Sequence, residues 1–393
     1  MMNILYILHT VGVIEGSAKS FMTLLDGLVG RGVTPHVITP GEQGIYKVLQ
    51  KKGIHVKSLN YRSGVYPNFY SIKDKLLFIP RLVGRRFLEY KAVRDIVIYC
   101  RRNDIQLIHT NVSVLSCGLS AAKRLQIPHI LHVREYADLD FGLHYYPSAK
   151  AFYRKVNAEN SYTICITKGI QQYHHFDMSR SRVIYNGVIV NASLDSSFVH
   201  DKEDHFFLFA GRIEPSKGVI QVVEAFDQYC QVSVEKNVTL KIAGEITDRA
   251  YYDYILSYVR EKGLQTRIEI LGVQRNIDVL MRHAIALIVS SPFEAFGRCI
   301  PEAMLNHCLT IGRDTAGTKE QYDNGLALCG KEIGLRYNTT QELAAHMRDV
   351  ASSPSSMVYA EMKENASQVV KQLYGKETYV AGVISFYQEI LSK

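Results

Sequence analysis

Short apolar runs alternate with longer segments of helical periodicity along most of the chain. The runs are continuously apolar rather than alternating, a pattern typical of strands buried on both faces. We expect strands at 4–8, 36–39, 105–109, 129–133, 162–167 and 183–185, and a second series at 206–210, 238–243, 267–271, 285–290 and 309–311. Segments long enough for helices separate them, so the pattern predicts two parallel, doubly wound α/β sheets in succession.

The length of 393 residues exceeds what one hydrophobic core usually serves, so two domains are expected. A polar stretch at 191–204 separates the two series of strands and gives an N-terminal domain at 1–190 and a C-terminal domain at 191–373. The amphipathic end at 374–393 is expected to form a terminal helix that packs back onto the first domain. Such sheets bind ligands at the carboxyl ends of their strands, so a cleft facing both domains is the expected site.

Composition narrows the class of protein. Hydrophobic residues make up 47% of the chain and charged residues 21%, which suits large buried cores and argues against disorder. No stretch approaches the ~20 apolar residues of a membrane-spanning helix, and no signal peptide is visible, so a cytoplasmic location is expected. The seven cysteines form no Cys-x-x-Cys pair and are expected to be buried, reduced thiols rather than a metal site.

The first loop with candidate chemistry follows the expected strand at 206–210. It runs through Gly211 and Arg212 to Lys217 and Gly218, directly before a helical pattern. Arg212 offers a planar fork of donors and Lys217 a flexible point charge beside the positive end of a helix, a combination that suits a diphosphate. A solvated basic turn explains this loop about equally well when it is taken alone.

The second loop follows the expected strand at 285–290 and contains two carboxylates, Glu294 and Glu302, on either side of Gly297. Pro301 is expected as the first residue of a helix, which puts Glu302 in the first turn, where the helix dipole favours negative charge. Carboxylates accept paired hydrogen bonds from vicinal hydroxyl groups such as those of a sugar or a ribose. The alternative is a helix-capping Glu302 and a surface Glu294.

These loops resemble those of family 4 of the retaining glycosyltransferases, the group 1 type, which have the two-domain GT-B fold. The resemblance is carried by Gly211-Arg212, Lys217-Gly218, Glu294 and Glu302 with seven residues between them in a Glu-Ala-Phe-Gly-Arg frame, Tyr185-Asn186-Gly187-Val188, Ile242-Ala243-Gly244 and Gly317-Thr318-Lys319-Glu320. It covers nearly the whole chain and implies an α/β protein with the GT-B fold, in which two Rossmann-like domains face a central cleft.

The resemblance implies that Arg212 and Lys217 bind the diphosphate of a nucleotide-sugar donor. It also implies that Glu302 binds the ribose and that Glu294 faces the donor sugar. The expected catalytic set is His132, Glu294, Arg212 and Lys217. The expected donor-binding set adds Gly16, Ser17, Gly244, Phe296, Gly297, Arg298 and Glu302 to Arg212, Lys217 and Glu294. No Asp-x-Asp motif occurs in a suggestive loop, so neither a metal nor another cofactor is expected.

In the first domain the resemblance is looser. Of the glycine-rich loop after the first strand only Gly16 is retained, and the amides of Gly16 and Ser17 can meet a phosphate at the start of a helix. His132, in the expected strand at 129–133, resembles the histidine that contacts the donor sugar. A hydrogen-bonded structural histidine is the alternative.

Four further residues are assigned to the acceptor side, namely His109, Asn111, Arg134 and Glu135. His109 ends one expected strand and Asn111 follows it, while Arg134 and Glu135 follow the expected strand at 129–133. A capped helix start at Asn111 or Ser113 explains that part of the chain almost as well.

Residues 73–102 carry nine basic side chains against three acidic ones and hold most of the net charge of +8. Apolar residues interleave with these charges, so a cationic amphipathic surface that lies on anionic lipid is one interpretation. A solvated helix whose apolar side belongs to the core is the other. Nucleic acid is not an expected partner, because no nucleic-acid module accompanies the charge.

Together these features predict a glycosyltransferase that moves a sugar, of the hexosyl type, from a nucleotide-diphosphate donor to an acceptor hydroxyl with retention of configuration. A glycan or lipid-linked acceptor in bacterial polysaccharide or lipopolysaccharide assembly is expected, with a peripheral position on the inner face of the cytoplasmic membrane. The alternatives are a nucleotide-sugar epimerase of similar fold and a non-catalytic protein that binds sugar nucleotides.

Overall fold

The computed structural model describes residues 1–13, 15–67, 72–189, 205–235 and 237–393. The polar stretch at 191–204, expected as the domain boundary, lies outside these residues. The chain divides into two compact units. The first contains Met1–Gly187 and Lys376–Lys393, and the second contains Val188–Gly375.

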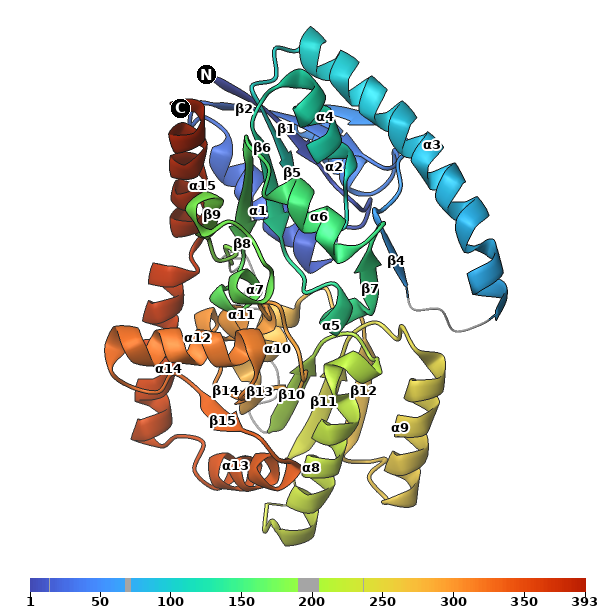
Figure 1. Cartoon of the computed structure of the whole chain (residues 1–393). Coiled ribbons are helices and arrows are strands. Elements are labelled where there is room, and N and C mark those ends of the chain that lie inside the picture. The colour runs from blue at the N-terminus through green and yellow to red at the C-terminus, as the bar shows by residue number, and fades with distance from the viewer. Residues whose placement is uncertain (14, 68–71, 190–204, 236) are drawn as a thin grey trace. The chain divides into compact units, whose positions relative to one another are not determined.

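The first unit is built on a parallel seven-stranded sheet with the order β3-β2-β1-β5-β6-β8-β9 (Figure 1). The strands are β1 (Met2–Ile7), β2 (Val33–Thr39), β3 (His55–Ser58), β5 (Leu107–Thr110), β6 (His129–Val133), β8 (Ser161–Cys165) and β9 (Ser181–Val183). Side chains of β1 alternate between the faces, as strand geometry requires: Ile4 and Tyr6 join one core, and Leu5 and Ile7 join the other. Both faces are therefore apolar, which explains the continuous apolar runs in the sequence.

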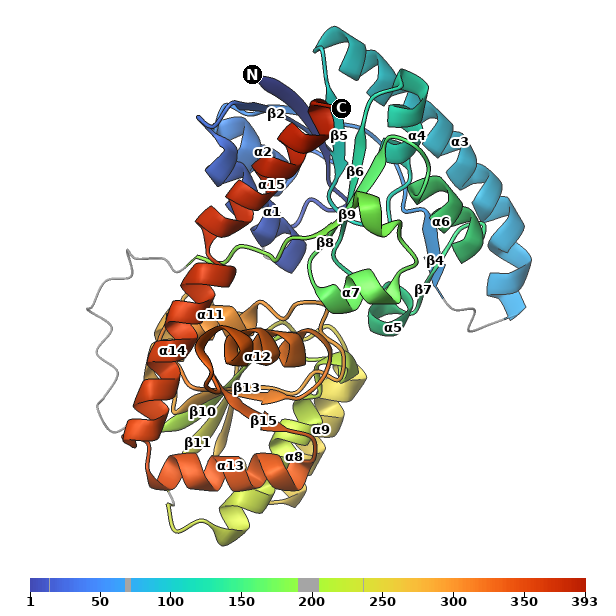
Figure 2. The same cartoon turned by 60° about the vertical axis from the view of Figure 1, so that its left-hand side comes forward.

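Helices cover both faces of this sheet (Figure 2). One face holds α1 (Gly16–Leu28), α2 (Ile45–Lys51) and α15 (Lys376–Leu391), and the other holds α3 (Ile72–Arg102) and α4 (Cys117–Leu125). The remaining elements are the antiparallel pair of β4 (Val65–Pro67) and β7 (Leu143–Tyr145), α5 (Asp138–Phe141), α6 (Ala149–Val156), α7 (Lys168–Tyr173) and a 3₁₀ turn at Met178–Arg180.

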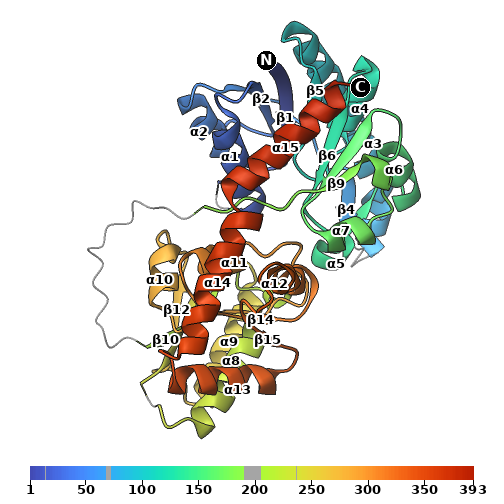
Figure 3. The ribbon, with the colours of Figure 1, turned by 90° about the vertical axis from the view of Figure 1, so that its left-hand side faces the viewer.

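The last helix, α15, packs against α1, and the two cross in Figure 3. The crossing is close at Gly27, where a Cβ would lie 2.3 Å from Cγ2 of Val380. Six side chains of α15 are buried in the core of the first unit: Tyr379, Val380, Val383, Phe386, Tyr387 and Ile390. The end of the chain is thus an integral part of the first sheet's packing.

The second unit repeats the plan with a parallel six-stranded sheet of the order β12-β11-β10-β13-β14-β15. Its strands are β10 (Phe206–Ala210), β11 (Thr239–Ala243), β12 (Ile268–Gly272), β13 (Ala286–Val289), β14 (Thr310–Arg313) and β15 (Leu335–Tyr337). One face packs on α8 (Val219–Val232), α9 (Arg249–Glu261) and α13 (Thr340–Ser352). The other packs on α10 (Ile277–His283), α11 (Cys299–Leu305) and α12 (Ala316–Cys329), with α14 (Met357–Leu373) against α11 and α12. A 3₁₀ turn, Pro215–Lys217, precedes α8.

The expectation of two doubly wound α/β sheets is confirmed, and each expected strand has its counterpart. The sequence missed short strands at the edges and in the hairpin, β3, β15, β4 and β7, because they have few apolar residues in succession. The helix expected from 374 begins instead at Lys376, after a break at Tyr374 and Gly375. Within the described residues, no helix is long and apolar enough to cross a bilayer.

Candidate functional site

The loop after β10 places two cations at the carboxyl end of the second sheet. Nη2 of Arg212 lies 3.1 Å from Oε1 of Glu214, and more than a third of the Arg212 side chain is exposed. Burial raises the pKa of Glu214, but hydrogen bonds from Ser216 and Thr247 and the charge of Arg212 outweigh it and lower the pKa overall. Glu214 is therefore an anion that holds Arg212 at the surface.

Lys217 and Glu294 are 77 positions apart in the chain but meet in an ion pair. Nζ of Lys217 lies 2.5 Å from Oε1 of Glu294, and the two side chains are only 20% and 18% exposed. The hydroxyl of Ser291 donates to the same oxygen at 2.7 Å. The contact arises because β10 and β13 are neighbours at the point where the strand order reverses, the position at which such sheets bind ligands.

The ends of β10 and β11 approach each other closely at Gly211 and Gly244. The Gly211 amide donates to the carbonyl of Ala243 at 2.9 Å, and a Cβ on Gly244 would lie 1.7 Å from the Gly211 carbonyl oxygen. No other residue fits at position 244 without moving the backbone. The glycine therefore holds the loop of Arg212 against the next strand.

The loop that contains Glu294 and Gly297 is held by the start of α12. The amide of Gly317 donates to the carbonyl of Glu294 at 2.8 Å, and a Cβ on Gly317 would lie 2.6 Å from that oxygen. Gly297 has a φ of +73°, which favours glycine. Oγ1 of Thr318 is buried beside this loop and has no hydrogen-bond partner among the described residues.

Glu302 lies one turn after Arg298 and pairs with it. Nη2 and Nε of Arg298 lie 2.9 and 3.0 Å from Oε1 of Glu302, and both side chains are mostly buried. The expectation that Pro301 begins the helix is wrong: α11 begins at Cys299, which makes Pro301 its third residue and leaves Glu302 in the first turn. The side chain of Phe296 is buried against Tyr374, with ring centroids 5.5 Å apart.

In the first unit, α1 begins at Gly16, and Ser17 lies in its first turn. The carboxylate of Glu15 accepts a hydrogen bond from Thr10 at 2.8 Å and lies 3.7 Å from Nε2 of His9. This acidic side chain folds onto the loop after β1 and does not cap the helix. The first-turn amides of a helix have no partner within the helix, so those of α1 are of the kind that binds an anion.

His109 on β5 and His132 on β6 lie side by side in the core of the first unit. Nε2 of His109 is 3.0 Å from Nδ1 of His132, and both rings are fully buried. Arg134, also buried, donates to Asn111 at 3.0 Å and to Asn186, and its Nη2 lies 3.3 Å from Nδ1 of His132. Three of the residues assigned to the acceptor side thus belong to one network with His132.

Glu135 belongs to a different cluster. Its Oε1 accepts hydrogen bonds from the amide and hydroxyl of Ser113, both at 2.7 Å, and that hydroxyl lies 2.7 Å from the hydroxyl of Tyr145. Burial raises the pKa of Glu135 to about 7 despite these bonds. The alternative of a helix start at Asn111 or Ser113 is wrong, because α4 begins at Cys117.

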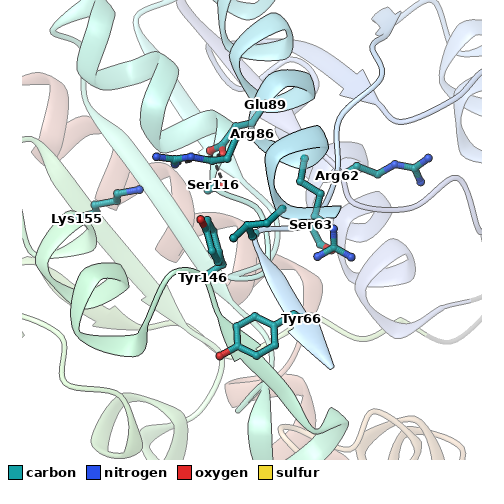
Figure 4. A pocket seen from close by; sticks show the side chains of 11 residues that line it. Arg62, Ser63, Tyr66, Arg86, Glu89, Ser116, Tyr146 and Lys155 are labelled. Carbon is teal, nitrogen blue, oxygen red and sulfur yellow. Dashed lines mark hydrogen bonds and ion pairs between the residues drawn. The ribbon is translucent and has the colours of Figure 1, made fainter. Parts of the chain in front are cut away.

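A separate pocket lies in the first unit, between α3, β4 and α6 (Figure 4). Its lining includes four cations, Arg62, Arg85, Arg86 and Lys155, and one carboxylate, Glu89. In Figure 4 the ends of Arg86 and Lys155 are directed toward the same part of the pocket, over Tyr146. None of the residues assigned from the sequence to donor or acceptor lines this pocket.

The first half of α3 exposes an apolar stripe. Leu76, Ile79, Val83 and Phe87 recur at helical spacing and are 62–73% exposed. In the second half Ala92, Val93, Ile96 and Cys100 are buried in the core. The core interpretation of residues 73–102 therefore holds for the second half of the helix only.

Among the described residues, no group of three or more His, Cys, Asp or Glu side chains is placed to hold a metal ion. The cysteines that the structure describes are all free thiols; four are buried, and Cys329 is exposed.

Comparison with known proteins assigns the chain to a family. A family model described as Glycosyltransferase Family 4 matches residues 14–191, and one described as Glycosyl transferases group 1 matches residues 192–369. The chain belongs to this family of glycosyltransferases and has the GT-B fold. No match was found among curated proteins.

Solved structures agree with the fold over the whole chain. HepE of Anabaena, in complex with UDP and glucose, is 18% identical, with a TM-score of 0.75 over 99% of this chain and 100% of that one. A glycosyltransferase of Rickettsia africae is 18% identical, with a TM-score of 0.77 over 99% and 98%. TarM of S. aureus, in complex with fondaparinux, alpha-GlcNAc-glycerol and UDP, is 13% identical, with a TM-score of 0.70 over both complete chains.

The sequence provided no indication of several residues that contact the candidate site residues or line the basic pocket. Ser291 holds Glu294, Tyr379 and Tyr387 of α15 reach the histidine network, and Lys155 lines the basic pocket. The spacing of Tyr379, Val383 and Tyr387 marks one helix face, but nothing in the sequence shows which strand that face meets.

Proposed function

We propose that this glycosyltransferase moves a sugar from a nucleotide-diphosphate donor, a UDP-sugar in the first instance, to an acceptor hydroxyl with retention of configuration. The observation that carries the proposal is the ion pair of Lys217 and Glu294 at the carboxyl ends of β10 and β13. Arg212 and Glu302 lie on the segments that follow the same two strands. Structures of the similar HepE in complex with UDP and with UDP-glucose support a uridine nucleotide.

In this proposal the charge on the leaving diphosphate is balanced by protein cations. Arg212 lies at the surface, and Lys217 is placed beside the start of α8, so both can approach phosphate oxygens. Glu294 holds Lys217 in position and faces the sugar, while Glu302 receives the ribose hydroxyls. The bond from the anomeric carbon to the diphosphate breaks, the acceptor oxygen bonds to the same carbon, and the acceptor proton leaves with the diphosphate.

We propose further that the acceptor is amphiphilic and phosphate-bearing, and that it is met at an anionic membrane surface. The exposed apolar stripe of α3 has cations beside it, and the pocket of Arg86 and Lys155 adjoins the same helix. An apolar face flanked by cations binds the boundary between lipid chains and anionic headgroups. A lipid-linked glycan in cell-surface polysaccharide or lipopolysaccharide assembly has this chemistry.

Turnover of a nucleotide-sugar panel by the purified chain, with and without phosphate-bearing glycolipids, tests the proposal. Nucleoside diphosphate should be released fast only when acceptor is present, and the product's anomeric configuration by NMR should match that of the donor. The rate should be unchanged in excess chelator, because Arg212 and Lys217 balance the diphosphate charge in place of a metal ion. Conversion of the donor without acceptor would identify an epimerase, and binding of donor without turnover would identify a non-catalytic protein.

A further inference from the structure

A line of buried hydrogen bonds in the first unit leads from α15 to His132. The hydroxyl oxygens of Tyr6 and Tyr387 are 3.1 Å apart, and that of Tyr387 lies 2.5 Å from Nδ1 of His109. Across the ring, Nε2 of His109 lies 3.0 Å from Nδ1 of His132. All four side chains are fully buried. At the end of the line, Nε2 of His132 is buried with no hydrogen-bond partner among the described residues.

Arg134 favours one direction of donation along this line, the direction in which Tyr387 and His109 are the donors. A guanidinium has donors and no acceptor, and Nη2 of Arg134 lies 3.3 Å from Nδ1 of His132. The same Nη2 donates to Asn111 at 3.0 Å and to the hydroxyl of Tyr379 at 3.1 Å, and it has only two protons. Its positive charge beside Nδ1 of His132 therefore favours a lone pair over an N–H group on that nitrogen. His109 must donate to it from Nε2 and, as a neutral ring, accepts at Nδ1 from the hydroxyl of Tyr387.

The opposite direction is unfavourable. If His109 accepted at Nε2, the proton of His132 would sit on Nδ1 and face the N–H groups of Arg134. The positive end of the His132 N–H group would then lie beside the guanidinium charge in a buried, low-dielectric environment, where such repulsion is costly.

Both imidazoles are neutral in this environment. Burial and the charge of Arg134 lower the pKa of His109 and of His132 well below the usual value. A neutral His132 that accepts at Nδ1 has its one ring proton on Nε2. The atom with no partner is therefore a donor, and it needs an acceptor oxygen to offset the loss of hydration.

We infer that Tyr387 and His109 are positioning residues, which hold His132 in the tautomer protonated at Nε2 so that it donates to an oxygen of the donor sugar. The identity of that ligand rests on the proposed function, whereas the tautomer rests on the hydrogen-bond geometry alone. The last helix of the chain thus acts on the sugar-binding histidine through His109, without touching the sugar itself.

Ring-nitrogen NMR of the ¹⁵N-histidine-labelled full chain tests the tautomer directly. The signal of His132, assigned by its loss in His132→Gln, should show a protonated Nε2 and an unprotonated Nδ1 near neutral pH. A protonated Nδ1 in the wild-type protein overturns the inference. This result does not depend on any variant folding, nor on the protein being a transferase.

Two matched variants test the role of Tyr387. Tyr6→Phe and Tyr387→Phe each remove one buried hydroxyl from the same line, but only Tyr387→Phe removes the donor to His109. In Tyr387→Phe a fraction of the molecules should have His132 in the tautomer protonated at Nδ1. In Tyr6→Phe no such fraction is expected. The same tautomer in both variants overturns the role of Tyr387.

A second pair of variants tests His109. His109→Gln keeps an N–H group that can donate to His132, and His109→Leu keeps none. In His109→Gln, His132 should remain protonated at Nε2. In His109→Leu, His132 should be a mixture of the two tautomers. An unchanged tautomer in His109→Leu overturns the role of His109.

Kinetics separate this inference from the proposed function. In Tyr387→Phe kcat/KM for the donor should fall about tenfold, the effect of one lost hydrogen bond, while affinity for nucleoside diphosphate stays the same and Tyr6→Phe stays within about twofold. An equal loss in both variants contradicts the positioning role. A wild-type protein with the expected tautomer and no turnover of any nucleotide sugar contradicts the proposed function instead.

Discussion

Glu294 and Glu302 carry the same charge but have different partners in the second unit. Glu294 accepts from Lys217 and Ser291, which come from separate loops, whereas Glu302 pairs with Arg298 on its own helix. Replacing each carboxylate with an amide should therefore release different cations. This difference makes the two proposed roles separable by experiment.

Glu302→Gln should weaken binding of both nucleoside diphosphate and intact donor by ~1–3 kcal/mol, because a charge-assisted hydrogen bond to the ribose is lost. Glu294→Gln should leave nucleoside diphosphate affinity unchanged or higher, since Lys217 is freed for phosphate, while kcat falls. Calorimetric titration and initial rates measure both effects, with Ser291→Ala as a control that keeps the carboxylate. Equal losses of nucleotide affinity in the two glutamate variants would show that the roles are wrongly assigned.

Glu135 makes the stability of the protein depend on pH. Burial raises its pKa from the usual value near 4.5 to about 7. Between these two pH values the carboxyl group is protonated in the folded state and ionised in the unfolded state. Stability from this group is greatest at low pH and is lost as pH rises through the window from 4.5 to about 7.

Glu135→Gln should remove this loss, because a neutral amide can still accept from Ser113. At pH 8 the variant should be more stable than the wild type by ~1–3 kcal/mol, and at pH 4 the two should be similar. Urea unfolding at the two pH values measures the difference. A variant that is less stable at pH 8 would mean that the ionised carboxylate is well paired in the folded state.

At the scale of elements, α3 combines two environments in one helix. Its second half packs on the sheet, whereas its first half presents Leu76, Ile79, Val83 and Phe87 to solvent beside exposed cations. Exposed apolar stripes of this kind mark interaction surfaces. Arg85 is a poor residue for testing the charges, because it donates to the carbonyl of Val65 and so supports local structure.

Changing Arg81, Arg86 and Lys91 to Gln should weaken binding to anionic vesicles about 100-fold, at ~1 kcal/mol for each cation near the surface. The matched control changes Arg94, Arg101 and Arg102 to Gln nearer the end of α3, beyond the exposed stripe, with the same loss of charge. Co-sedimentation at ordinary salt measures both. If the two triple variants bind alike, net charge and not the exposed stripe governs the association.

At the scale of the whole molecule, the order of the chain differs from the order of its packing. α15 follows the second unit in sequence but belongs to the core of the first. The first unit cannot complete its core until the second has been synthesised.

Ending the chain at Gly375 should therefore unfold the first unit while the second keeps its fold. Six buried side chains are lost, at ~1.5–3 kcal/mol each, which matches or exceeds the usual stability of a domain. Hydrogen exchange read by peptide should show lost protection in β1 and β5 and retained protection in β10 and β13. A chain ending at Leu391 keeps all six side chains and is the control; protection of β1 without α15 would contradict the prediction.

The sequence by itself determined the two α/β sheets, the loops of Arg212 and Glu294 and the family. These features are local: continuous apolar runs report burial on both faces of a strand, and glycine, proline and charge at strand ends report the loops. The short strands β3 and β15 gave no such signal, since edge strands need fewer apolar residues. Pro301 was misplaced by two positions because helix boundaries depend on capping contacts as well as on residue type.

Only the tertiary structure decided which distant residues meet. Lys217 forms an ion pair with Glu294, and the hydroxyl of Tyr387 forms a hydrogen bond with His109. The buried carboxylate of Glu135 accepts a hydrogen bond from Ser113. None of these contacts follows from periodicity, because each depends on strand order and on which helix face meets which sheet. The inferred tautomer of His132 and the raised pKa of Glu135 both depend on those contacts, since burial and neighbouring groups influence a pKa and a tautomer. The sequence therefore specified which chemical groups are present, and the packing determined the contacts on which their protonation depends.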